Sequence, residues 1–145
     1  MTRIGLEVHV QLTTQTKLFC GCPNRFSEIP NVFVCDTCIG FPGSKPRLNR
    51  KAVEYALKIG LALNCQFPKE TFLSRKSYFY PDMGKNFQIT QYEMPIAASG
   101  SLAVGKQKIR IRRIQMEEDP ARLVHMADGE PAAITTAKYV LVDYG

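Results

Sequence analysis

Four cysteines in two close pairs are the strongest chemical signal in this sequence. The first pair is a C-x-C motif at Cys20 and Cys22, and the second is a C-x₂-C motif at Cys35 and Cys38. Thiolates at these spacings can converge on one tetrahedral Zn²⁺ ion while the residues between the pairs fold back as a loop. Because all four ligands would come from the protein, we predict a structural zinc. Reduced, unliganded cysteines are the alternative.

A second group of reactive side chains begins in the opening segment, R-I-G-L-E-V-H-V-Q-L at residues 3–12. Its strict alternation predicts a β-strand with Glu7 and His9 on one face. We expect the other face to pack on a core, through Ile4, Leu6, Val8, Val10 and Leu12. A carboxylate and an imidazole so placed can share a divalent metal or act as an acid/base pair. A solvated strand face is the alternative.

Acidic residues at the end of a later segment could complete that group. Glu117 and Glu118 follow a stretch that contains Arg110, Arg112 and Arg113. Carboxylates bind Mg²⁺ and guanidinium groups bind phosphate oxygens, so these residues are candidates for a site for a metal-bound nucleotide. The chain has no Walker motif and no G-x-G-x-x-G, which indicates a nucleotide site of another kind. A merely charged strand end is the simpler explanation.

Length, composition and charge are those of one soluble domain. The chain has 145 residues, 45% of them hydrophobic and 22% charged, and a net charge of +6 that favours an anionic partner such as nucleic acid or nucleotide. No apolar run approaches the roughly 20 residues of a membrane helix. The N-terminus does not resemble a signal peptide, and five cysteines do not pair off. We therefore expect a cytoplasmic location, no membrane contact and reduced thiols.

The periodicity of the chain predicts an α+β fold with a mainly antiparallel sheet and packed helices. A helix is expected over about 50–63, capped by Asn49, and a hairpin over 101–104 and 107–116. Strands are expected at 88–92 and 138–144, and turns at 81–84, 98–101 and 128–131. The basic, aromatic segment 72–81 fits either a nucleic-acid surface or an ordinary strand.

Seven motifs in one order give the chain a family resemblance that composition alone does not provide. They are I-G-L-E-V-H-V-Q-L, L-F-C-G-C, V-C-D-T-C-I-G-F-P-G, L-N-R-K-A-V-E-Y-A, S-R-K-S-Y-F-Y-P-D, Q-I-T-Q-Y and Q-M-E-E-D. Together they resemble the B subunit of the aspartyl/glutamyl-tRNA(Asn/Gln) amidotransferase, from residue 4 to about 144. The resemblance implies a glutamine-synthetase-like catalytic domain, the cradle, with a zinc-binding insertion at about 18–40.

The same resemblance implies a reaction and its partners. ATP phosphorylates the side-chain carboxylate of Glu or Asp misacylated onto tRNA(Gln) or tRNA(Asn), and ammonia then displaces the phosphate. The glutaminase (A) subunit supplies the ammonia from glutamine, and a small C subunit completes the heterotrimeric ligase. The cofactors implied are Mg²⁺ and ATP, with a zinc site that only some family members possess.

The resemblance also assigns roles to particular residues. Glu7, His9 and Glu118 match the motif positions that bind Mg²⁺ at the kinase site. Lys76 matches a lysine of the polar channel and active-site region. The family's stretch after the V-D-Y strand is missing, since the chain stops at Gly145.

From this departure we expect an N-terminal part of the cradle domain over 1–145, with the rest of that domain and the tRNA-binding tail absent. We expect this part to be inactive by itself. A non-enzymatic, zinc-stabilised RNA-binding module is the alternative. The Glu7, His9 and Glu118 group separates the two hypotheses, because an RNA-binding module has no need of a magnesium site.

Overall fold

A computed structural model describes most of the chain at the level of side chains. It covers residues 4–27, 29–80 and 83–119 in this way, together with the backbone of three strands at 121–125, 131–135 and 139–144. Within these residues, no helix is long and apolar enough to cross a membrane. The turn expected at 81–84 is described only from Met83, and most of the loop expected at 128–131 lies outside the described residues.

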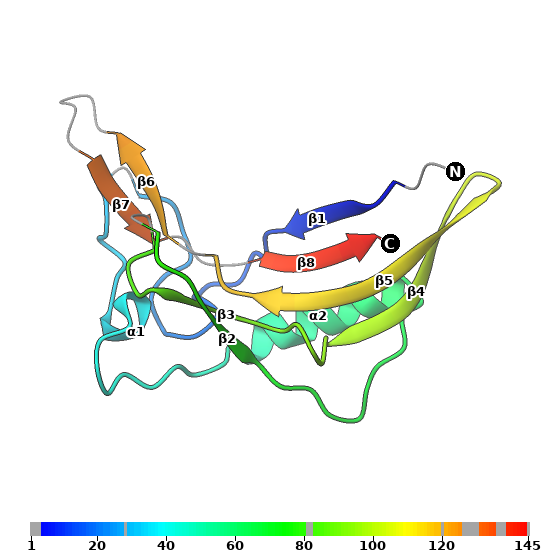
Figure 1. The fold of residues 1–145 in the computed structure, drawn as a ribbon, viewed down its shortest axis with the longest axis horizontal. Coiled ribbons are helices and arrows are strands. Elements are labelled where there is room, and N and C mark those ends of the chain that lie inside the picture. The colour runs from blue at the N-terminus through cyan, green and yellow to red at the C-terminus, as the bar shows by residue number, and fades with distance from the viewer. Residues whose placement is uncertain are drawn as a thin grey trace.

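The main sheet has four antiparallel strands in the spatial order β1-β8-β5-β4 (Figure 1). The first strand of the chain therefore pairs with the last, and both lie beside the long hairpin. The bounds of these strands are β1 Leu6–Val10, β4 Ala97–Val104, β5 Gln107–Glu117 and β8 Tyr139–Tyr144. The expected strands and hairpin are confirmed, and with them the α+β class with antiparallel sheets and few helices.

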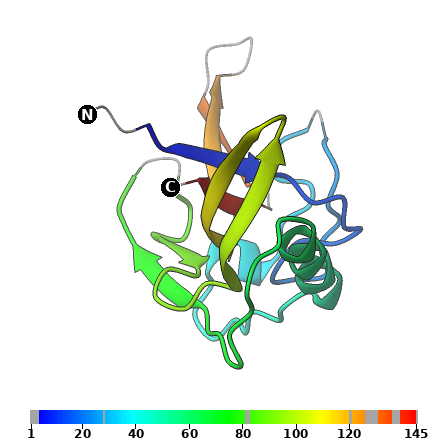
Figure 2. The same ribbon diagram turned by 90° about the vertical axis from the view of Figure 1, so that its right-hand side faces the viewer.

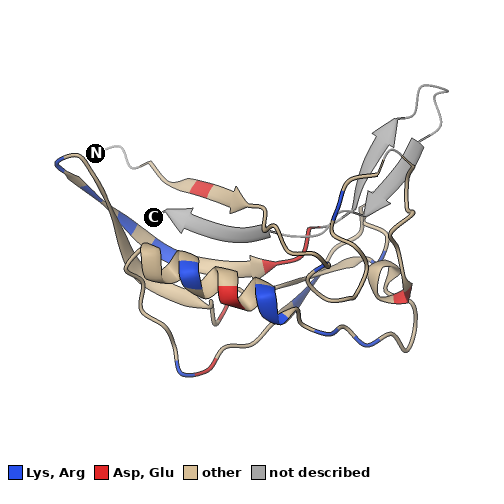
Figure 3. Cartoon of the chain, turned by 180° about the vertical axis from the view of Figure 1, so that it is seen from behind, with Lys and Arg blue, Asp and Glu red and all other residues tan. Residues whose placement is uncertain are grey.

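Helix α2, Arg50–Ala62, confirms the expected helix and covers one side of this sheet (Figures 1 and 2). The Asn49 side chain caps it by accepting hydrogen bonds from the backbone N–H groups of Lys51 at 2.9 Å and Ala52 at 3.4 Å. Its small buried residues let the helix approach β4 and β5 closely, and basic and acidic residues alternate with uncharged ones along its length (Figure 3). The resulting core contains Leu12, Leu18, Phe19, Ala52, Ala56, Ile96, Ala97, Ile111, Ile114 and Met116.

The turn expected at 98–101 is wrong, because these residues lie inside strand β4. Cross-strand pairing continues on both sides of Ser99, with Ala98 opposite Arg113 and Gly100 opposite Ile111. Ser99 has a left-handed backbone at φ 56°. Gly100 is required by a close approach: a Cβ there would lie 2.3 Å from the Cys65 sulfur. Ser99 and Gly100, which are typical turn residues, therefore lie in a strand. Gly100 allows that strand to pack closely against the segment that follows α2.

The expectation that the apolar face of the opening strand packs on the core is wrong for most of β1. Ile4 is 83% exposed, Leu6 61% and Val8 39%, whereas Leu12 is buried. The reason is the position of β1 at the edge of the sheet, since α2 packs over β4 and β5 at the opposite end of the strand order. Alternation identified the strand correctly, but it could not show which strands the helix would cover.

Three smaller elements surround the main sheet. Strands β2, Ser74–Ser77, and β3, Phe87–Thr90, form an antiparallel pair, and β6, Ala121–His125, pairs with β7, Pro131–Thr135. The short helix α1, Asp36–Ile39, follows the third cysteine. Segment 72–81 thus contains strand β2, and the aromatic residues Phe79 and Tyr80 that follow it are exposed.

Replacing Asn49 tests how the helix is joined to the loop before the cysteines. Its Nδ2 group donates to the Thr16 carbonyl at 3.1 Å, the Thr16 hydroxyl at 2.9 Å and the Lys17 carbonyl at 3.3 Å. Asn49→Ala removes both the cap and these bonds, and we expect it to lower the free energy of unfolding by about 2 kcal/mol. Asn49→Ser keeps a capping oxygen and should lose clearly less. Urea unfolding measures both, and equal stability of the two variants would contradict a dual role.

Candidate functional site

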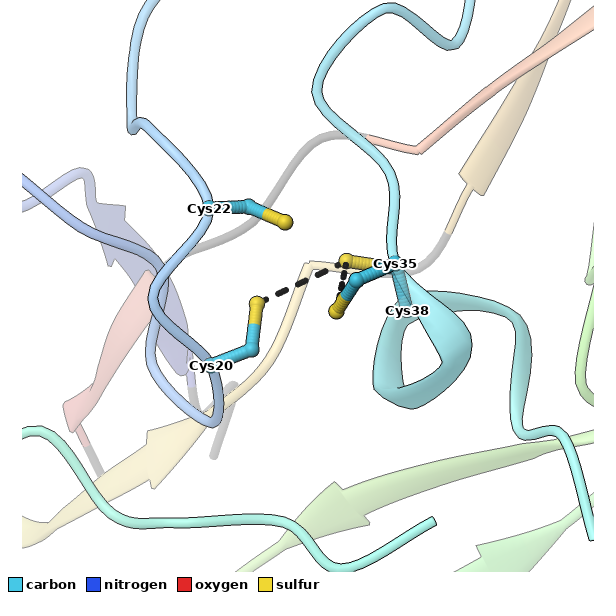
Figure 4. A group of neighbouring side chains, drawn as sticks. All are labelled: Cys20, Cys22, Cys35 and Cys38. Atoms are coloured by element: carbon cyan, nitrogen blue, oxygen red, sulfur yellow. Dashed lines mark hydrogen bonds between the residues drawn. The ribbon is translucent and has the colours of Figure 1, made fainter.

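The four paired cysteines meet at one point, although they come from two separate segments (Figure 4). Cys20 and Cys22 lie on the loop after β1, Cys35 immediately precedes α1, and Cys38 lies within it. Their sulfur atoms all lie within 4.8 Å of one another. The Cys20 and Cys38 sulfurs are 3.6 Å apart and those of Cys35 and Cys38 3.9 Å apart, and all four thiols are free.

This geometry fits one zinc ion. With Zn–S bonds of about 2.3 Å, tetrahedral coordination places sulfur atoms about 3.8 Å apart. The donor set is complete with four sulfurs, which is typical of structural sites. The cluster could therefore bind zinc, as the spacing predicts.

Hydrogen bonding and burial shift the pKa values of the clustered cysteines in different directions. Hydrogen bonding from Cys20, helped by the Lys17 ammonium, lowers the pKa of Cys38 below its usual range. Burial raises the pKa of the Cys22 thiol to about 11. Neighbouring sulfur atoms of the cluster thus have pKa values shifted in opposite directions.

Local backbone bonds form the two halves of the cluster. Lys17 N–H donates to the Cys22 carbonyl at 3.0 Å, which closes a tight loop around the C-x-C motif. In the other half, the Cys35 carbonyl accepts from the N–H of Cys38 at 2.8 Å, and Gly40 ends α1 in the left-handed region at φ 65°.

A second candidate site is a cleft of about 500 Å³ between β1, β2, β3 and β5. Four residues singled out in the sequence line it together, namely Glu7, Lys76, Arg113 and Glu117. The remaining lining residues are Ser74, Arg75, Gln88, Thr90, Tyr92, Glu93 and Gln115. The cleft is thus lined by both acidic and basic side chains and is open to solvent.

Glu117 is a carboxylate of this cleft that is held by two side-chain contacts. Its Oε1 lies 3.2 Å from His9 Nε2, and its Oε2 accepts from the Thr90 hydroxyl at 3.4 Å. Burial raises the pKa of Glu117, and the nearby Glu7 charge acts in the same direction, while His9 opposes them. His9 therefore holds the carboxylate in place.

Glu118, the next residue, faces away from His9. Its Oε2 lies 2.5 Å from Lys85 Nζ, and its Oε1 accepts from the Ile89 N–H at 2.6 Å. Burial raises the pKa of Glu118 and the Lys85 charge opposes that shift. Adjacent residues at the end of a strand point to opposite sides, so the two glutamates serve different surroundings. A magnesium-binding role for Glu118 stays a prediction.

The arginines expected to bind phosphate are also separated. Arg113 lines the cleft, with its guanidinium 4.6 Å from the centre of the Tyr92 ring. Arg110 and Arg112 are exposed and do not line it. In the part of the chain that the structure describes, the cysteine cluster is the only group of three or more metal-ligating side chains with close ligand atoms. Glu7, His9 and Glu118 thus do not form a ready ligand set.

Sequence reasoning missed the residues that hold the end of β5. The Gln88 side chain donates to the Glu118 carbonyl at 2.8 Å, and the Gln91 side chain accepts from the Met116 N–H at 3.0 Å. Lys85 and Lys17 were missed as well. The two glutamines stand in the Q-I-T-Q-Y motif, which was the one available signal. No pattern in the sequence indicates that either lysine is buried.

Gly40, which follows the cysteine cluster, packs against Lys85 of the Glu118 ion pair. A Cβ atom on Gly40 would lie 2.5 Å from Lys85 Cβ and 3.3 Å from a ring carbon of Phe87. The end of α1 therefore packs directly on the residue that pairs with Glu118, and only glycine fits there.

The chain matches a known family over nearly its whole length. Residues 2–144 match the family model described as the GatB/GatE catalytic domain. Curated relatives carry the name of the B subunit of the aspartyl/glutamyl-tRNA(Asn/Gln) amidotransferase. That of Methanospirillum hungatei is 49% identical over 148 residues, covering 99% of this chain and 30% of the relative. Those of Clostridium kluyveri and Saccharolobus solfataricus are 52% and 48% identical, covering 87% and 99% of this chain. The chain spans about 30% of the length of such relatives.

Metal analysis tests the cysteine cluster. We expect about one zinc ion per chain, because four thiolates complete a single tetrahedral site. Cys22→Ser should lower the zinc content strongly. Cys65→Ser is the matched control, since Cys65 packs beside the core, outside the cluster. Atomic absorption after dialysis gives the ratios, and a folded, metal-free wild-type protein would refute the site.

Removing Lys85 tests the buried ion pair. Its side chain is 8% exposed and that of Glu118 10%, so Lys85→Met leaves a buried carboxylate without its cation. We expect a loss of about 3–5 kcal/mol in the free energy of unfolding. Adding Glu118→Gln should restore part of it, because the uncompensated charge is gone. Denaturant unfolding measures these changes, with Lys58→Met at an exposed position as the control; a fully stable Lys85→Met protein would count against the pair.

Proposed function

Because this chain belongs to the GatB/GatE catalytic domain family, we propose that it is the N-terminal part of the kinase and amidation domain of a tRNA-dependent amidotransferase. The relatives are named as one subunit among others, which implies a complex of several subunits. We propose a glutaminase (A) subunit and a small C subunit as its partners, and the cytoplasm, with its misacylated tRNA(Gln) or tRNA(Asn), as its location. The antiparallel sheet with one covering helix is compatible with the proposed glutamine-synthetase-like cradle.

The proposed reaction has two steps. First, an oxygen of the Glu or Asp side-chain carboxylate attacks the γ-phosphorus of ATP, which forms an acyl phosphate and releases ADP. Ammonia from glutamine then attacks the acyl carbon. The bond from that carbon to the phosphate oxygen breaks, phosphate leaves, the nitrogen loses a proton, and the amide remains on the tRNA.

The observation that carries this proposal is the charged cleft lined by β1, β2, β3 and β5. Mg²⁺ is usually held by one or two protein carboxylates, with waters and phosphates as its other ligands. Glu7 and Glu117 line the same cleft and fit that requirement. When bound, the ion would offset charge on the phosphates during transfer. Arg113 and Lys76 line the same cleft and could bind phosphate or carboxylate oxygens.

His9 and Glu118 have distinct parts in the proposal. His9 lies 3.2 Å from Glu117 and fixes the carboxylate that faces the cleft. The family resemblance implies Glu118 as a magnesium ligand, but its contacts with Lys85 and Ile89 direct it to the other side of the strand end. The geometry thus favours Glu117 as the carboxylate nearest the metal, with Glu118 acting through a buried ion pair.

Paired substitutions separate the two glutamates in the full-length protein with its partner subunits. Glu117→Gln should lower ATP-dependent amidation of misacylated tRNA by about 100-fold, because it removes a charge aimed at the transferred group. Isothermal titration should show the matching loss of Mg²⁺ affinity, shared by a Glu7→Ala, His9→Ala variant. Glu118→Gln should keep most of that affinity.

Glu54→Gln, on the outer face of α2, is the control and should leave both readouts unchanged. The proposal fails if wild type and the Glu7→Ala, His9→Ala variant bind Mg²⁺ equally and negligibly. Wild-type Mg²⁺ affinity in Glu117→Gln, together with its loss in Glu118→Gln, would instead assign the ion to the neighbouring carboxylate.

A further inference from the structure

Lys17 is a buried cation beside the cysteine cluster that the proposed reaction does not use. The residue is only 6% exposed. Its Nζ donates to the Phe33 carbonyl at 2.6 Å and to the Cys38 sulfur at 3.5 Å. Buried ammonium groups are costly unless a negative charge and hydrogen-bond acceptors surround them. These two contacts place the ammonium group directly beside the cysteine cluster.

The backbone of Lys17 is fixed by the protein core. Its carbonyl accepts from Asn49, the residue that caps α2, and its N–H donates to the Cys22 carbonyl. The two residues that follow it, Leu18 and Phe19, are buried core residues. The lysine is thus held in place by contacts that do not depend on a metal ion.

The side chain of Lys17 also crosses between the two halves of the cluster. Lys17 precedes the C-x-C pair on the same loop, whereas both acceptors, Phe33 and Cys38, belong to the segment of the C-x₂-C pair. The ammonium group therefore joins the halves directly. It does so beside the contact between the Cys20 and Cys38 sulfur atoms, which are 3.6 Å apart.

A zinc ion with four thiolate ligands carries two net negative charges, which must be compensated when water has limited access. We propose that Lys17 is the outer-sphere cation of this metal site, donating to the Cys38 sulfur, offsetting one of these charges and holding the two cysteine pairs in register. It is a positioning residue and not a ligand. The inference concerns the zinc site and is independent of the amidotransferase reaction.

Zinc affinity of the full-length protein tests the proposal, with competition against a chelator as the measurement. Lys17→Met keeps an unbranched side chain of similar length and removes its charge. We expect zinc affinity to fall about 10- to 100-fold. Lys17→Arg keeps the charge and should recover most of it. Lys45→Met, at an exposed position with the same change in net charge, should equal the wild type. Wild-type affinity in Lys17→Met would overturn the proposal.

The absorption spectrum of the cobalt-loaded protein distinguishes a hydrogen bond to sulfur from a purely structural role of Lys17. In the Co²⁺-loaded protein, loss of an N–H···S bond makes the sulfur a better electron donor. The sulfur-to-cobalt charge-transfer band should therefore shift to lower energy in Lys17→Met and stay near its wild-type position in Lys17→Arg. An unshifted band in a folded Lys17→Met protein would argue against the bond.

The Cys38→His variant allows a second test in case Lys17→Met does not fold in the otherwise wild-type protein. Cys38→His replaces a charged ligand with a neutral one and lowers the negative charge of the site by one. In that background, Lys17→Met should fold and cost much less zinc affinity than in the wild type, because less charge needs compensation. If Lys17→Met is equally damaging in both backgrounds, the lysine serves packing alone and the proposal is wrong.

Discussion

Helix α2 packs against strands β4 and β5, and the placement of the side chains at both candidate sites follows from this contact. Ile114 and Met116, which share one face of β5, are 0–2% exposed, as are the small residues Ala52 and Ala56 on the helix. Burial of this apolar surface fixes the rotation of β5 about its own axis. Because residues alternate along a strand, the same rotation sends Glu117 into the cleft and Glu118 toward Lys85.

Three buried or half-buried charges have specific partners, and these partners connect the two candidate sites. Glu118 is paired with Lys85, Glu117 lies against His9, and Lys17 reaches the Cys38 sulfur. Gly40 at the end of α1 packs on Lys85, so the cysteine-bearing loop rests on the ion pair below the strand end. A metal ion in the cluster would therefore stabilise a surface that lies close to the proposed chemistry.

The cysteine loop itself has little apolar support. Phe26 and Ile29 within it are exposed, whereas Leu18 and Phe19 before it belong to the core. Hydrogen bonds from Asn49 tie its first residues to the helix, and Asn24 donates to the Thr14 carbonyl at 2.8 Å. An ion bound by the four sulfur atoms would add a firm connection between the two cysteine pairs. This division explains why the loop would need a metal although the sheet beside it does not.

Features that depend on spacing along the chain could be predicted from the sequence alone. These include the four-cysteine cluster, helix α2 with its Asn49 cap, the β4–β5 hairpin and the family of the protein. Local chemistry decides such features, because a C-x₂-C pair or a capping asparagine acts within a few residues of itself.

Features that depend on contacts between distant segments could not be predicted in this way. Periodicity does not show which strand a helix covers, so the burial expected for Leu6 and Val8 was wrong. The folded chain was needed to separate Glu117 from Glu118 and to bring Lys17 and Lys85 to their buried partners. In each case the partner lies at least 21 residues away along the chain, beyond the reach of any local pattern.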